Sequence, residues 1–127
     1  MRSTKLAAVL FVEIAEFPVM LSKGEEEALA ELLAWRDIAR AELPEHGGEL
    51  MDATGAELLL LFGSAVSAVQ YALTLAIAVR SRVATLAPSR RYDIRSGIHL
   101  GEIWSEDGHV FGNGVNVAAR VMQGRST

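Results

Sequence analysis

Apolar and polar positions alternate along this chain in runs typical of strands and in spacings typical of helices. An almost unbroken apolar run with β-branched and aromatic residues, KLAAVLFVEI (5–14), predicts a buried central strand. ELMDAT (49–54) and ELLLLF (57–62) predict two further strands. The four residues TGAE around Gly55 are short enough to join them as a hairpin.

Two helices are predicted between the strands. Ser22 and Glu25 form an S-x-x-E capping box, and Pro44 with Gly47 and Gly48 would close that helix. A second helix is predicted over 65–86, capped by Ser64. The expected inner face of the first helix is Leu29, Leu32, Leu33, Ile38 and Leu43. That of the second is Val66, Val69, Leu73, Ala76, Val79 and Val83.

The last part of the chain predicts a strand over 92–104, which could continue past Gly101 into a hairpin of 103–105 with 109–111. A final helix is expected to begin near 112–115. The order is β-α-β-β-α-β with an added hairpin and a C-terminal helix. It predicts an α+β fold (an α/β sandwich) with a ferredoxin-like βαββαβ core, in which the helices cover one face of an antiparallel sheet.

Composition narrows the function classes. The net charge of −4 does not favour a nucleic-acid binder, and no apolar run is long enough to cross a bilayer. The absence of cysteine fits a cytoplasmic chain and excludes disulfides and thiolate sites. The three histidines have no metal-ligand spacing. Trp35 and Trp104 are interpreted as packing residues rather than ligand stackers.

Four segments, in this order, resemble the class III nucleotidyl cyclase domain of the adenylate and guanylate cyclase family. They are LFVEIAEF (10–17), HGGELMDATGAELLLLFGSAVSAV (46–69), DIRSGIHLGEI (93–103) and DGHVFGNGVNVAAR (107–120). The resemblance extends from residue 5 to about residue 122, and its last segment is the most specific. It implies one cyclase-like domain over 1–127, without the C-terminal elements that family domains usually carry.

The resemblance implies attack of a ribose 3′-oxygen on the α-phosphate of ATP or GTP, with pyrophosphate as the leaving group. Two Mg²⁺ or Mn²⁺ ions, held by two Asp residues, would support that reaction. The first Asp position is Glu13, one methylene longer, and the second is Ala56, which offers no side-chain oxygen. The adjacent Glu57 is a possible substitute. Neighbours on a strand point to opposite faces, so Glu57 would serve only if the turn were rebuilt.

Two further parts of the family site are altered. Ala15, Glu16 and Phe17 occupy the phosphate loop, and Glu16 replaces a glycine near the triphosphate. The positions that read the base are Asp52 and His109, where the family's adenylate cyclases commonly have Lys and Asp or Thr. A reversed charge and an imidazole do not suit the usual contacts with adenine.

Asn116 and Arg120 match the family motif. The resemblance implies that Asn116 orients the ribose and that Arg120 stabilises charge on the α-phosphate. A spacing of four places both side chains on one helix face, about 40° apart, and the planar Arg fork suits phosphate. Structural roles are open alternatives, because Asn116 could cap the helix and Arg120 could pair with Glu102 or Asp107.

Three hypotheses follow. The preferred one is a degenerate cyclase-homology domain in cyclic-nucleotide signalling, acting as a dimerisation or regulatory module or as a weak nucleotide-binding module. The second is an active cyclase using Mg²⁺ or Mn²⁺, as a homodimer or as a heterodimer with a chain that supplies the carboxylates. The third is a ferredoxin-like domain that binds other proteins.

Overall fold

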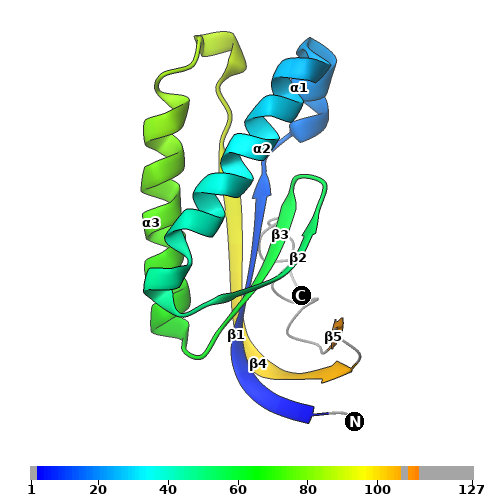
Figure 1. Ribbon diagram of the computed structural model, residues 1–127, viewed down its shortest axis with the longest axis vertical. Coiled ribbons are helices and arrows are strands. Elements are labelled where there is room, and N and C mark those ends of the chain that lie inside the picture. Colours follow the sequence, from blue (N-terminus) through cyan, green and yellow to red (C-terminus); the bar gives the residue numbers. More distant parts are fainter. Residues whose placement is uncertain (1–2, 107–108, 112–127) are drawn as a thin grey trace.

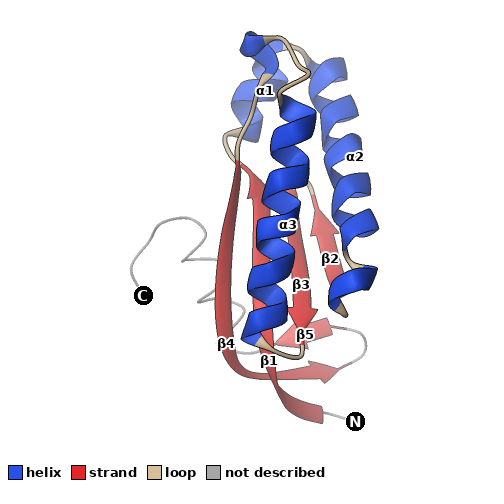
Figure 2. Ribbon diagram, turned by 90° about the vertical axis from the view of Figure 1, so that its left-hand side faces the viewer, coloured by secondary structure: helices blue, strands red, loops and turns tan. Residues whose placement is uncertain are grey.

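The computed structural model describes residues 3–106 and 109–111 as one antiparallel five-stranded sheet with helices on one of its faces (Figures 1 and 2). The strands are β1 (Ser3–Ile14), β2 (Glu49–Thr54), β3 (Glu57–Phe62), β4 (Ile94–Glu106) and β5 (His109–Phe111). The helices are α1 (Phe17–Lys23), α2 (Glu25–Glu42) and α3 (Ala65–Val83). Short 3₁₀ turns cover Pro44–His46 and Pro88–Arg90.

The strand order β2-β3-β1-β4-β5 confirms the predicted ferredoxin-like core. β1 is central, paired with β3 on one side and with β4 on the other. The predicted hairpin of β2 and β3 has the expected bounds, with Gly55 at a φ of 56° in its turn. The added hairpin is also confirmed, because β4 pairs with β5 from Trp104 to Glu106. The predicted helix near 112–115 lies outside the described residues.

The main core lies between the sheet and the two long helices. Alternate side chains of β1 and β3 face the helices, as the period of two in a strand requires. The buried members of this core in the strands are Ala8, Leu10, Val12, Ile14, Leu58, Leu60 and Phe62. A smaller cluster on the other face of the sheet contains Ala7, Val9, Leu61 and Ile103. An apolar β1 buried on both faces explains its unbroken hydrophobic run.

The first helix prediction was wrong at its start. A separate helix, α1, begins at Phe17, with Pro18 in its first turn, where the missing N–H of proline is not needed. Gly24 separates α1 from α2 and is the N-cap of α2. Ser22 lies within α1, and its hydroxyl donates to the carbonyl of Val19 at 2.7 Å. Ser22 therefore does not form the predicted capping box.

The predicted inner faces were only partly confirmed: Leu32, Val79 and Val83 are buried, and Ile38 and Leu43 pack against the core, but the other large aliphatic residues are exposed. In α2, Leu29 and Leu33 are 43% and 60% exposed. In α3, Leu73 is 61% exposed and Val66 is 65% exposed. The residues that α2 buries are Ala28, Leu32, Trp35 and Ala39. Those that α3 buries are Ala68, Tyr71, Leu75, Val79 and Val83. Large and small residues share the buried stripes, so side-chain size alone did not identify which apolar residues face the sheet.

Two polar contacts join α2 to α3 above this core. The Tyr71 hydroxyl donates to the carbonyl of Ala39 at 2.8 Å, and Arg82 pairs with Glu31 at 2.6 Å. The Ser64 cap of α3 is confirmed, since its hydroxyl accepts the Ser67 amide at 3.1 Å. Within the described ranges, no helix is long and apolar enough to cross a membrane.

Candidate functional site

The candidate site lies where β1 ends, next to the turn between β2 and β3 (Figure 1). The amide of Ile14 donates to the carbonyl of Ala56 at 3.0 Å, which ties that turn to β1. Glu13 lies directly opposite Glu57 on β3 and opposite Arg95 on β4. The structure thus brings the two predicted metal positions and the possible substitute together at one end of the sheet.

Glu13 is surrounded by one carboxylate and one guanidinium. Its Oε1 lies 3.7 Å from Nη1 of Arg95, and its side chain is only 16% exposed. Burial raises the pKa of Glu13, the neighbouring carboxylate of Glu57 raises it further, and the Arg95 charge opposes both effects. The ionised form of Glu13 is therefore less favourable in the folded chain than in the unfolded chain, despite its cationic partner.

This balance predicts a pH-dependent gain in stability for Glu13→Gln. The folded chain binds the Glu13 proton more tightly than the unfolded chain does. Stability is therefore lost as the pH rises from about 4.5 through the raised pKa, and the cost persists at neutral pH. Thermal unfolding should show a higher Tm for Glu13→Gln than for wild type at pH 7, and a difference that shrinks towards pH 4.

The matched control is Glu49→Gln at an exposed position of β2, which should show no such pH-dependent difference. A lower Tm for Glu13→Gln at pH 7 would mean that the Arg95 ion pair outweighs burial and the Glu57 charge.

The predicted phosphate loop has an unusual backbone at the position where the family has glycine. Glu16 adopts φ 56° and ψ 39°, and in the described part of the chain it is the one non-glycine residue with a positive φ. Its carbonyl accepts the amide of Val19 at 3.0 Å, so the loop leads directly into α1. The amide of Ala15 donates to the carbonyl of Asp93 at 2.8 Å. The left-handed conformation is present even though a side chain has replaced the expected glycine.

Glu16→Gly is therefore expected to stabilise the fold. The left-handed conformation costs an L-residue roughly 1–2 kcal/mol, and glycine avoids this cost. The greater freedom of glycine in the unfolded chain offsets about 0.4–1 kcal/mol of that gain. We expect a net gain of about 0.5–1 kcal/mol in urea denaturation. Glu16→Ala removes the carboxylate but keeps Cβ, so it should show no comparable gain. Equal gains in both variants would assign the effect to charge.

The remaining predicted residues are not all brought to this point. Asp52 is exposed on β2 beside a bulge, and Thr54 donates to its carboxylate at 3.1 Å. The backbone of His109 pairs with Glu106. β2 and β5 are the two edge strands, separated by three strands in the sheet order. Asn116 and Arg120 lie outside the described residues.

The donor set at positions 13, 56 and 57 does not fit a pair of divalent ions. Ala56 has only a methyl group, which packs towards the helix-side core, and its carbonyl already accepts the Ile14 amide. Glu13 already has Arg95 as a cationic partner. Among the residues that the structure describes, no group of three or more His, Cys, Asp or Glu could hold a metal ion. Mg²⁺ requires near-octahedral oxygen ligation, and the residue at the second carboxylate position, Ala56, contributes no side-chain oxygen to it.

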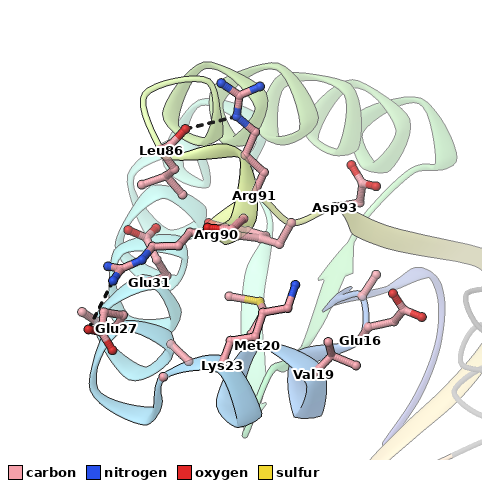
Figure 3. A pocket seen from close by; sticks show the side chains of 16 residues that line it. Glu16, Val19, Met20, Lys23, Glu27, Glu31, Leu86, Arg90, Arg91 and Asp93 are labelled. Atoms are coloured by element: carbon pink, nitrogen blue, oxygen red, sulfur yellow. Dashed lines mark hydrogen bonds and ion pairs between the residues drawn. The ribbon is translucent and has the colours of Figure 1, made fainter.

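A cleft of ≈ 610 Å³ adjoins the phosphate loop (Figure 3). Its walls are the end of α1, the first turns of α2 and the segment from Leu86 to Asp93, and it reaches Ala15 and Glu16. Arg90 bridges two of these walls by pairing with Glu27 on α2 at 3.4 Å, as the dashed line in Figure 3 shows. The cleft has the size of many small-molecule sites and lies at the base of the predicted loop.

Comparisons with known proteins bear on the family and the fold of this chain. No protein-family model matches the sequence. The chain is 35% identical over 118 residues to a Rhizobium meliloti protein named as a candidate adenylate cyclase 3. It is 33% identical over 116 residues to an adenylate cyclase of Streptomyces coelicolor. A crystal structure titled adenylate/guanylate cyclase/hydrolase from Silicibacter pomeroyi superposes with a TM-score of 0.87 at 29% identity. The chain belongs to the class III nucleotidyl cyclase family.

The cyclase domain accounts for most of this chain but only a part of its relatives. The matches cover 92% and 90% of the chain, yet 20% and 29% of the Rhizobium and Streptomyces proteins. The Silicibacter structure matches over 97% of this chain and 72% of its own length. The family and the fold that the sequence motifs implied are thus confirmed.

Sequence reasoning missed two arginines of the cyclase domain. Arg95 lies in the segment DIRSGIHLGEI. Its position opposite Glu13 follows only once the pairing register of β1 with β4 is known. Arg36 on α2 donates to the carbonyl of Gly55 in the site turn. No local pattern signals that second contact, because it joins a helix to a hairpin through the tertiary packing.

Proposed function

We propose that this domain is a degenerate cyclase-homology domain in cyclic-nucleotide signalling, acting as a dimerisation or regulatory module that binds a nucleoside triphosphate weakly. The observation that supports this most is the pair of side chains at the family's two carboxylate positions, near the end of β1. A methyl group stands at position 56, and Glu13 is paired with Arg95. The turnover of a family cyclase depends on carboxylates at these two positions.

The charges at this end of the sheet support weak binding. A triphosphate would meet the planar fork of Arg95, which can donate two hydrogen bonds to phosphate oxygens. It would also meet Glu13 and Glu57, which oppose each other across β1 and β3. Two carboxylates against one guanidinium leave a net negative charge. Like charges about 4 Å apart repel by about 1 kcal/mol even at the dielectric constant of water.

The partner in this proposal is a second cyclase-type domain, either another copy or a different chain. The domain would then supply Asn116 and Arg120 to a site whose carboxylates belong to the partner. Sedimentation of the chain alone and in a mixture with an intact cyclase domain tests this part. A chain that stays monomeric in both would contradict it.

Nucleotide binding and turnover test the central proposal. ATP and GTP are titrated by calorimetry with and without Mn²⁺, and cyclic nucleotide formation is assayed under the same conditions. We expect weak binding heat and a rate no higher than that of an Arg120→Ala control. Absence of heat with any triphosphate would leave a protein-binding role in its place.

The second candidate function is an active cyclase that converts ATP or GTP to cyclic AMP or cyclic GMP and pyrophosphate, using Mg²⁺ or Mn²⁺. The identity to the Streptomyces adenylate cyclase favours it. Cyclic nucleotide production that exceeds the Arg120→Ala control would establish it and would overturn degeneracy.

A further inference from the structure

Arg36 connects helix α2 to the turn of the candidate site. The residue is half-buried, and its Nη2 donates to the carbonyl of Gly55. Its Nε is buried and has no hydrogen-bond partner in the described structure. The Nη2 atom of Arg36 therefore bonds to the turn, whereas its buried Nε atom makes no hydrogen bond that would favour this position. Among the residues that the structure describes, the Arg36 side chain makes no hydrogen bond or ion pair other than this contact with the turn.

The turn accepts two hydrogen bonds, one from α2 and one from β1. Gly55, at a φ of 56°, accepts from Arg36 on the helix side, and the carbonyl of the next residue, Ala56, accepts from Ile14 of β1 at 3.0 Å. Two successive peptide carbonyls thus point at two different elements. Strand pairing already places Glu57 opposite Glu13, so these two bonds act on the turn residues between the strands, Gly55 and Ala56.

We propose that Arg36 is a positioning residue that sets the β2–β3 turn of the site against the end of β1. The side chain joins α2 to a hairpin 19 residues further along the chain, so it links two elements that no local hydrogen bonding holds together. Any shift of α2 relative to the sheet is transmitted to the turn through this contact. The consequence for nucleotide affinity rests on the proposed function, whereas the consequence for the turn does not.

Amide hydrogen exchange by NMR tests the positioning directly. The Ile14 amide reports the bond from β1 to the turn, and the Leu10 amide, in the middle of β1, reports global opening. In Arg36→Gln we expect Ile14 to exchange about tenfold faster, the effect of losing one supporting hydrogen bond, with Leu10 unchanged. Arg36→Lys keeps a charged donor and should recover part of the protection. Arg40→Gln, at an exposed site one turn later on α2, is the matched control and should change neither amide.

Two outcomes would overturn the proposal. Unchanged Ile14 exchange in Arg36→Gln would mean that the turn is set without Arg36. Equal acceleration of Ile14 and Leu10 would mean that Arg36 only supports overall stability. ATP titration adds the functional readout, where Arg36→Gln should weaken binding about tenfold relative to Arg40→Gln. If the wild-type chain binds no ATP, the proposed function fails, and the exchange data still decide the role of Arg36.

Discussion

Replacing Trp35 by alanine is expected to lower the free energy of unfolding by about 3–5 kcal/mol. Trp35 is 0% exposed and belongs to the core between α2 and the sheet. The loss combines the transfer of a large aromatic side chain with the cavity that it leaves. A domain of this size is stable by only about 5–15 kcal/mol, so the substitution should remove a large part of the total stability. Urea denaturation followed by circular dichroism measures the change.

Two companion variants separate packing from other causes. Trp35→Phe should cost less, because it keeps an aromatic ring and removes an indole N–H that is buried without a partner in the described structure. Leu33→Ala on the same helix should change stability by less than about 0.5 kcal/mol, since Leu33 is 60% exposed. A cost at Leu33 as large as that at Trp35 would show that the outer face of α2 is covered in solution.

Restoring the family residues at the site turn is expected to have the largest effect on activity. The double variant Ala56→Asp with Glu57→Gly returns a carboxylate to the turn and removes the one that faces Glu13 across β1 and β3. We expect cyclic nucleotide production with Mn²⁺ to rise at least about tenfold, because a metal ion stabilises charge in the transition state by several kcal/mol. The measurement is the initial rate with ATP and with GTP.

The control for this gain is the same double variant with Arg120→Ala. The gain should disappear, since the resemblance assigns Arg120 to the phosphate that is attacked. A gain that survives Arg120→Ala would point to a site other than that of the family. No gain at all would show that the turn is not the cause of degeneracy, and would direct attention to Glu16 and the base-reading positions.

The candidate site could be predicted from the sequence only where family motifs carried it. Glu13, Ala56 and Glu57 were named from the motifs, and the register of β1 with β3 brings them together. Arg95 and Arg36 were not foreseen, because their contacts depend on β4 pairing with β1 and on α2 packing over the hairpin. The left-handed backbone of Glu16 was hidden as well, since glutamate carries no signal for that conformation.

By itself, the sequence determined the strands, the β2–β3 hairpin and the Ser64 cap, because side-chain alternation, a turn glycine and a capping hydroxyl act over a few residues. It also determined the family. Only the tertiary structure decided which faces of α2 and α3 are buried. Both helices carry apolar residues at exposed as well as buried positions, and packing against the sheet buries the stripes that contain Trp35 in α2 and Tyr71 in α3. The tertiary structure likewise decided the partners of Glu13, since they come from strands more than 40 residues away in sequence.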